Sequence, residues 1–123
     1  MKHPIQEDIL EAAKHLYMKK AQDVVTLRVS HMTIVADHFI LASGRSDVHT
    51  RALCDDIQDY FEKCGRQRLR IEGYREGRWI VLDYGDLLVH LFHAQEREFY
   101  GLERLWTDDG NMIKISDEHI KKD

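Results

Sequence analysis

The sequence lacks long apolar runs and an excess of positive charge, and we expect no secretory signal. No apolar run approaches the roughly 18 residues of a transmembrane helix. The first eight residues lack the apolar core of a secretory signal, and Glu7, Asp8 and Glu11 disfavour an organellar transit peptide. The formal charge is −4, from 18 basic and 22 acidic residues. This balance disfavours unaided binding of nucleic acid and suits a basic partner. We therefore expect a cytoplasmic protein.

Cysteine and proline are also scarce. The two cysteines, Cys54 and Cys64, form no C-x-x-C pair. On one helix they would lie on different faces and about 15 Å apart, too far for a disulfide. We expect two reduced thiols. With 123 residues, one proline, 43% apolar and 33% charged residues, the composition is that of one globular domain with a real core.

Periodicity predicts three helices and five strands. We expect helices from Pro4 to about Lys20, from Ser46 to Cys64 and from Glu96 to Trp106, the last with Phe99, Leu102, Leu105 and Trp106 as its apolar stripe. Strands are expected at residues 24–29, 38–42, 69–72, 78–82 and 87–92. The stretch after Trp106 is either a tail or a short added strand.

The order of these elements indicates the fold class. Short loops between the last three strands imply antiparallel pairing, and the strand–helix–strand step around residues 46–65 implies a parallel pair. We therefore expect an α/β (α+β-like) fold, with a mixed five-stranded sheet and helices packed on it.

Motifs for catalysis are weak. His90 and His93 form an H-x-x-H, but strand geometry points them to opposite faces, and no third metal ligand is evident. The segment Ser43–Ser46 before a helix could hold a phosphate but lacks the P-loop pattern, so a turn with an N-cap is the simpler interpretation. Asp83 and Asp86 could act as metal-binding acids, but no Asp-x-Asp is present. We expect no catalytic residue, no metal and no cofactor.

The segment from Ile71 to Asp86 is the most informative. Trp79, Val81 and Asp83 share one strand face, while Ile80 and Leu82 share the other. If Ile80 and Leu82 are core, Trp79 is an outward interface anchor. Its neighbours would then be Tyr74 and the acids Glu72, Glu76, Asp83 and Asp86. Alternatively, Trp79 packs under a helix as ordinary core, and the residue pattern favours neither.

A series of motifs in order carries a family resemblance. The sequence reads Ala36-Asp37-His38-Phe39-Ile40-Leu41-Ala42-Ser43-Gly44-Arg45-Ser46, then Ile71-Glu72-Gly73, then Trp79, three apolar residues and Asp83-Tyr84-Gly85-Asp86. It continues with Val89-His90-Leu91-Phe92, Arg97-Glu98-Phe99-Tyr100 and Leu102–Trp106. From about residue 6 to 108 it resembles the ribosomal silencing factor (Iojap-related) family. We accordingly expect a domain over 1–108 and a C-terminal tail over 109–123.

The resemblance implies a fold and a function. The family has a mixed-sheet α/β domain related to nucleotidyltransferases but without their catalytic acids. Its members bind large-subunit ribosomal protein number fourteen (uL14) on the intersubunit face, block joining of the small subunit and lower translation when nutrients are scarce. They often form homodimers. Organellar relatives act in large-subunit assembly, which is the alternative role.

The resemblance also suggests a partner-binding surface. On resemblance and geometry together, the expected partner-binding residues are Trp79 at the centre with Glu72, Tyr74, Asp83, Asp86 and His90 around it. An enzyme of a different class, a metal-dependent nucleotidyltransferase or nucleotide binder, would instead use Ser43, Ser46, Asp83 and Asp86.

Overall fold

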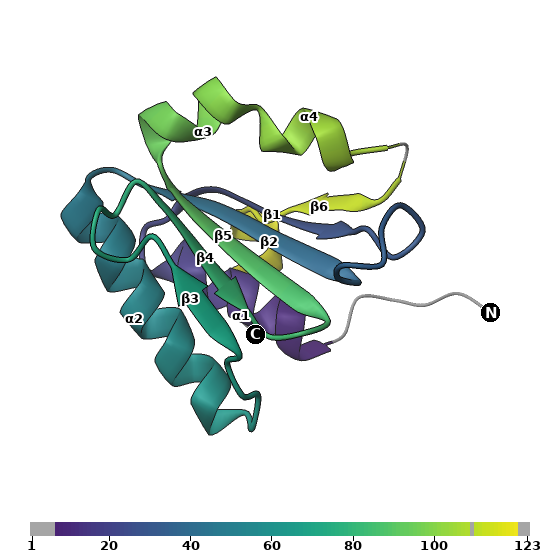
Figure 1. Cartoon of the computed structure of the whole chain (residues 1–123), viewed down its shortest axis with the longest axis horizontal. Coiled ribbons are helices and arrows are strands. Elements are labelled where there is room, and N and C mark those ends of the chain that lie inside the picture. Colours follow the sequence, from purple (N-terminus) through teal and green to yellow (C-terminus); the bar gives the residue numbers. More distant parts are fainter. Residues whose placement is uncertain (1–6, 109, 121–123) are drawn as a thin grey trace.

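A six-stranded mixed sheet organises the chain (Figure 1). The computed structural model describes residues 7–108 and 110–120, with only the backbone at 98–100. Its elements are α1 (Glu7–Met18), β1 (Gln22–Arg28), β2 (His38–Gly44), α2 (Asp47–Lys63), β3 (Arg70–Glu72), β4 (Trp79–Asp83), β5 (Leu87–His93), α3 (Ala94–Tyr100), α4 (Leu102–Trp106), β6 (Met112–Lys114) and the 3₁₀ helix η1 (Asp117–Ile120). The predicted start of the first helix at Pro4 lies outside the described residues.

The strand order is β3-β4-β5-β2-β1-β6, with β2 and β5 parallel and every other neighbouring pair antiparallel. This confirms the mixed α/β sheet. The expectation of five strands is wrong by one, because β6 pairs with β1 and places Met112 opposite Leu27. The short added strand, one of the two alternatives for the last residues, is therefore formed. Its three residues show no alternating pattern, because Met112 and Ile113 are adjacent apolar residues.

Helices α1 and α2 cover one face of the sheet (Figure 1). Four apolar residues of α1 recur at helical spacing and are fully buried, as are Ile57 and Phe61 of α2; the four are Ile9, Ala12, Ala13 and Leu16. They pack on Ile80 and Leu82, which are also 0% exposed. Ser46 begins α2 as predicted, because its hydroxyl accepts a hydrogen bond from the His49 backbone N–H at 3.0 Å. This layer is the main core.

Helices α3 and α4 lie on the opposite face (Figure 1). The single helix predicted over 96–106 is wrong, since Gly101 adopts a left-handed conformation with φ of 61° and ends α3. The break changes the helical register. Leu102 and Trp106 pack on this face against a second core cluster, whereas Leu105, which we expected in the core, is 70% exposed. The second core cluster consists of Val25, Leu27, Val29, Ala36, Phe39, Leu41 and Phe92. The side chain of Phe99 lies outside the described residues.

Buried polar contacts fasten α3 to the sheet. The Arg97 guanidinium donates from Nη1 to the Ser43 hydroxyl and from Nε to the Glu103 carboxylate, both at 3.0 Å. Arg97 is only 6% exposed, so its charge is held by these partners inside the fold. Among the described residues, Cys54 and Cys64 are free thiols, and no helix is long and apolar enough to cross a membrane.

Candidate partner-binding site

The sheet face opposite α1 and α2 is only partly covered. Strand register places Trp79 opposite Phe92, Val81 opposite His90 and Asp83 opposite Leu88, so all six side chains share this face. Over β1, β2 and the end of β5 near Phe92 the face is closed by α3 and α4 (Figure 1). Over β3, β4 and the start of β5 at Leu88 it stays open. We call this surface the open strip; its residues are Arg70, Glu72, Trp79, Val81, Asp83 and Leu88, each half-buried or exposed.

Trp79 is held in a fixed orientation within the open strip. Its indole Nε1 donates a hydrogen bond to His90 Nδ1 at 3.1 Å, and its ring stacks on Phe92 with centroids 5.1 Å apart. Trp79 is half-buried and packs against the second core cluster. It therefore combines the two alternatives that the sequence left open, because part of the ring is packed and part faces solvent. A pre-oriented aromatic ring loses little conformational entropy on binding.

His90 supports Trp79 from beneath. It is 6% exposed and meets Phe39 edge-on, with ring centroids 5.0 Å apart. Burial lowers the pKa of His90 to about 4. The imidazole is therefore neutral at neutral pH, and the hydrogen bond from Trp79 requires the lone pair on Nδ1. This assigns the ring proton to Nε2, which has no hydrogen-bond partner among the described residues.

The charges of the open strip are of both signs. Glu72 and Arg70 are 67% and 69% exposed in their side chains, with Oε2 and Nε 3.8 Å apart. Such an exposed pair contributes little to stability and can re-form with a partner. Asp83 is half-buried, and its Oδ1 accepts the Gly85 backbone N–H at 2.8 Å, which holds the turn after β4. Two carboxylates and one guanidinium thus surround the aromatic centre.

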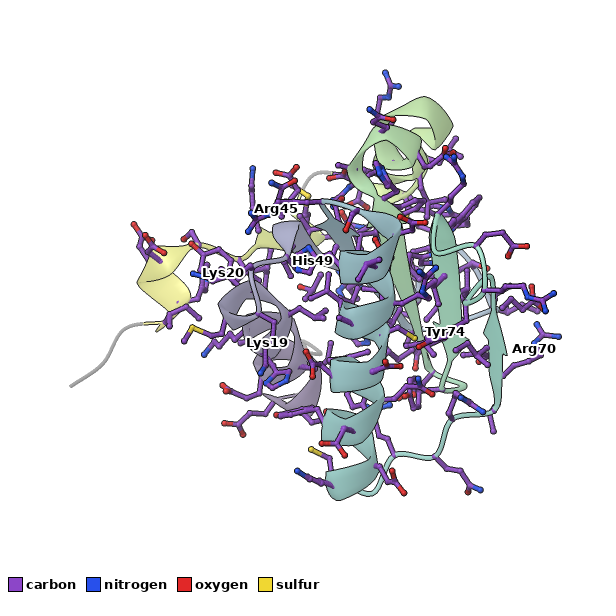
Figure 2. The ribbon with its side chains drawn as sticks, turned by 90° about the vertical axis from the view of Figure 1, so that its left-hand side faces the viewer. Lys19, Lys20, Arg45, His49, Arg70 and Tyr74 are labelled. Atoms are coloured by element: carbon purple, nitrogen blue, oxygen red, sulfur yellow. The ribbon has the colours of Figure 1, made fainter. Side chains whose placement is uncertain are left out.

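Two of the predicted residues lie elsewhere. The Tyr74 hydroxyl donates to the Asp55 carboxylate of α2 at 3.0 Å, so this ring faces the α2 side and does not flank Trp79 (Figure 2). Asp86 accepts a hydrogen bond from Arg66 Nη1 at 2.8 Å, and Arg66 also pairs with Asp8 of α1. Arg66 lowers the pKa of Asp8. The structure brings Glu72, Trp79, Asp83 and His90 together and places Tyr74 and Asp86 apart from them.

Val81 and Leu88 are members of the strip that our sequence analysis did not select. Both are half-buried beside Trp79 and His90, and they extend the apolar centre. The alternation along β4 already placed Val81 on the face of Trp79, so the sequence carried a signal for this residue. Leu88 could not be identified that way, because its position depends on the pairing of β5 with β4.

The residues of the alternative enzyme site are far apart. Ser43 is opposite Phe92, while Asp83 is opposite Leu88 at the other end of β5. Four residues of strand separate these two positions by about 13 Å. Among the side chains that the structure describes, no three of His, Cys, Asp or Glu are grouped to hold a metal. The histidine pair is also divided, because His90 is buried while His93 caps α3.

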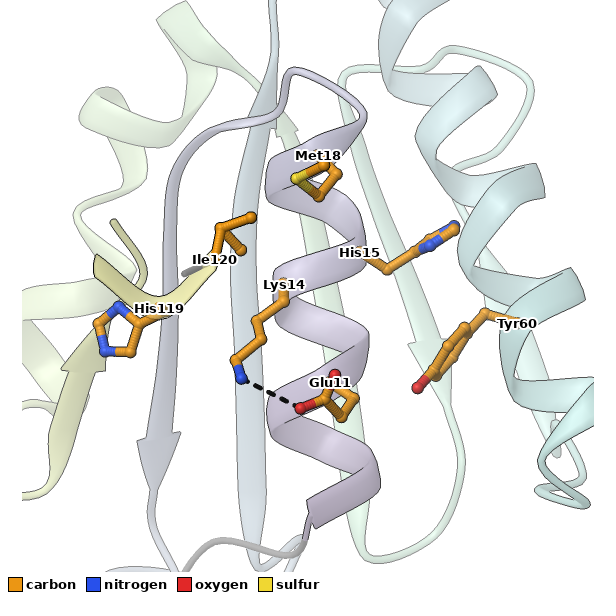
Figure 3. A pocket seen from close by; sticks show the side chains of 7 residues that line it. All are labelled: Glu11, Lys14, His15, Met18, Tyr60, His119 and Ile120. Atoms are coloured by element: carbon orange, nitrogen blue, oxygen red, sulfur yellow. Dashed lines mark hydrogen bonds and ion pairs between the residues drawn. The ribbon is translucent and has the colours of Figure 1, made fainter. Parts of the chain in front are cut away.

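A separate hollow of about 350 Å³ lies between α1, α2 and η1 (Figure 3). Its lining includes the Glu11–Lys14 ion pair, with Oε2 and Nζ 3.1 Å apart, and His15 stacked on Tyr60. The hollow is on the side of the sheet covered by α1 and α2. It therefore contributes nothing to the open strip.

The fold and the strip define a class: a single mixed-sheet α/β domain with one half-open face presenting an oriented tryptophan. The model of the family "Ribosomal silencing factor during starvation" (RsfS) matches residues 2–123, including the stretch 109–123 that the sequence resemblance left outside. The chain belongs to this family, as the resemblance predicted.

Individual relatives with similar sequences support this family membership. The chain is 39% identical over 104 residues to the ribosomal silencing factor RsfS of Bacillus subtilis, covering 84% of this chain and 88% of that protein. It is 29% identical over 114 residues to "Mitochondrial assembly of ribosomal large subunit protein 1" of Mus musculus, covering 88% of this chain and 50% of that one.

Among solved structures, a crystal structure of a Chromobacterium violaceum protein has a TM-score of 0.79 at 29% identity, covering 89% of this chain and 92% of that one. A Bacillus halodurans crystal structure has a TM-score of 0.75 at 31% identity, covering 89% and 100%.

Proposed function

We propose that this chain silences translation by binding uL14 on the intersubunit face of the large ribosomal subunit through the open strip. A domain seated there occupies space that the small subunit needs, so joining is blocked by steric exclusion. Membership in the family of ribosomal silencing factors supports the ribosome as the target. The observation that carries the choice of surface is the half-open sheet face with Trp79 held by His90 and Phe92.

The strip has the composition of a protein interface. A large aromatic ring lies at its centre, the half-buried Val81 and Leu88 extend the apolar surface, and charged residues form the rim. Glu72 and Asp83 are complementary to a basic ribosomal protein. A standard interface buries about 800 Å² on each partner, which one open sheet face with its surrounding loops can provide.

Sedimentation of purified large subunits with this protein, followed by addition of small subunits, tests the proposal. Wild type should co-sediment and suppress whole-ribosome formation. Trp79→Ala should bind at least about 30-fold more weakly, the effect of losing about 2 kcal/mol at an interface hot spot. Binding to purified uL14 should fall by the same factor.

Because Trp79 is half-buried, its truncation also removes packing. Circular dichroism and urea unfolding must show that Trp79→Ala is folded under the binding conditions. Glu72→Lys is a second variant that removes no packing, since Glu72 is exposed; it should slow association with a basic partner. A folded Trp79→Ala that still binds like wild type, or a wild type that does not bind uL14, would contradict the proposal.

A second role is large-subunit assembly, suggested by the printed name of the mouse relative. The two roles use the same docking surface but differ in outcome. Silencing predicts that mature, purified subunits fail to join in the presence of the protein. Assembly predicts that cells without it accumulate immature large subunits.

On the family resemblance we also propose that the protein is cytoplasmic and forms a homodimer. Sedimentation velocity of the isolated protein tests the homodimer.

A further inference from the structure

Three cationic side chains gather where α1 ends and α2 begins (Figure 2). Lys19 and Lys20 follow α1, and Arg45 precedes α2. The His49 ring connects the two segments, since Nδ1 accepts the Arg45 backbone N–H at 3.0 Å and Nε2 lies 3.2 Å from the Lys19 carbonyl oxygen. Only one imidazole therefore separates the two backbones. We call Lys19, Lys20 and Arg45 the basic corner.

The charges of the basic corner are exposed and not neutralised. Lys19, Lys20 and Arg45 are all exposed, and none takes part in an ion pair within the described part of the chain. Seven other cations of the described chain pair with carboxylates: Lys14, Lys63, Arg66, Arg70, Arg78, Arg97 and Lys114. Arg28, Arg51, Arg68, Arg75 and Arg104 take part in no ion pair there either, so what distinguishes the basic corner is that its three cations are adjacent. Three adjacent unpaired cations on a chain of net charge −4 indicate an anionic partner.

The basic corner lies at the same end of the sheet as Trp79. Register places Trp79 opposite Phe92, Phe92 opposite Ser43 and Ser43 opposite Gln22. Lys20 and Arg45 lie two residues beyond Gln22 and Ser43. Three strand spacings separate β4 from β1, which is about 14 Å. The corner joins the α1 and α2 layer to this end of the sheet, while the Trp79 ring lies on the opposite face, so a partner bound at Trp79 reaches the corner around the end of the sheet.

We infer that the basic corner binds backbone phosphates of ribosomal RNA on the large subunit, beside the protein surface that Trp79 contacts. This inference rests on the proposed function. Lysine ammonium and arginine guanidinium groups are the usual donors to phosphate oxygens. The positive end of α2, a helix of 17 residues that begins at Asp47, lies two residues after Arg45 and adds to the attraction. These contacts position the protein without reading sequence.

The salt dependence of binding provides the test. The triple variant Lys19→Gln, Lys20→Gln, Arg45→Gln is compared with a control of equal charge change, Lys14→Gln, Lys63→Gln, Arg68→Gln. The control residues lie on α1, at the C-terminal end of α2 and in the loop after it. Affinities of wild type and both variants are measured for purified large subunits and for purified uL14, at salt concentrations from 50 to 300 mM.

Each phosphate contact contributes about 0.7 to 0.9 to the slope of log affinity against log salt concentration. Loss of the basic corner should therefore flatten this slope by about 2 for the large subunit and leave affinity for isolated uL14 within twofold of wild type. The control variant should keep the wild-type slope.

The outcomes separate this inference from the proposed function. If wild type binds neither uL14 nor the large subunit, the proposed function fails. If wild type binds both and the corner variant keeps its slope on the large subunit, the RNA contact is refuted while the proposed function stands. If the corner variant also loses affinity for isolated uL14, the corner contacts an acidic protein surface, which likewise overturns the inference.

Discussion

Acid should destabilise this protein through the buried His90. The pKa of this imidazole is about 4 in the folded state, against 6.5 for an unperturbed histidine. Below pH 6.5 the unfolded chain binds a proton that the folded chain refuses. His90 therefore makes its full contribution to the free energy of unfolding above pH 6.5. This contribution is lost progressively as the pH falls toward 4, and no more of it is lost once both states are protonated. The difference between the two pKa values corresponds to a loss of about 3 kcal/mol in the free energy of unfolding over the whole interval.

Protonation of His90 also affects the open strip. A proton on Nδ1 removes the lone pair that accepts the Trp79 indole N–H. Of these two contacts, only the stacking on Phe92 would then orient Trp79. Acid should accordingly weaken binding to uL14 before the protein unfolds.

Urea unfolding of wild type and His90→Asn between pH 7.5 and pH 4.5 measures the effect. Asparagine can still accept the Trp79 N–H through Oδ1 but does not titrate. Over this range wild type should lose about 2.5 kcal/mol more free energy of unfolding than the variant. His38, whose pKa is also lowered by burial, is present in both proteins, so its contribution cancels in the comparison. Parallel pH profiles of the two proteins would refute the reasoning.

Three further substitutions test the fold. Gly73→Ala should lower the free energy of unfolding by more than about 2 kcal/mol, because φ is 83° and the new Cβ would lie 2.1 Å from the Trp79 carbonyl oxygen. Gly65→Ala is the control: its φ is 86° but its new Cβ meets open space, so it should lower the free energy of unfolding by about 1 kcal/mol. Asn111→Ala removes three hydrogen bonds to backbone groups and should cost about 2 kcal/mol, with faster amide exchange in β6. Leu105→Ser should change stability by less than about 0.5 kcal/mol, since Leu105 is 70% exposed. Urea midpoints decide all three, and a reversed order of costs would contradict the packing described.

Elements with a clear apolar period could be predicted from the sequence, and elements without one could not. The helix over Asp47–Lys63 was anticipated because its apolar spacing and the preceding Ser46 mark it. Strands β1 to β5 were anticipated from their apolar residues. β3 has only three residues but was anticipated, because Ile71 alternates with Arg70 and Glu72. β6 is equally short and gives no alternation, because Met112 and Ile113 are adjacent apolar residues. The break at Gly101 was missed because the apolar spacing continues across it, and a helical glycine costs only about 1 kcal/mol.

The candidate site was predictable only in part for a related reason. Alternation within β4 correctly placed Trp79 and Asp83 on one face. The directions of Tyr74 and Asp86 were not predictable, because both lie in turns and are set by side chains distant in sequence, Asp55 and Arg66. Sequence alternation describes a strand face, but it does not describe which way a loop residue turns.

The outermost strands of the sheet, β3 and β6, have three residues each, whereas β1, β2 and β5 have seven. An outer strand offers its free backbone N–H and C=O groups to any other chain, and a longer strand offers more of them. The exposed charges of Arg70, Glu72 and Lys114 on these two strands further discourage such pairing. The molecule can therefore keep half of a sheet face uncovered without extending into aggregates, and association is directed to the side chains of the face rather than to the backbone of the edges.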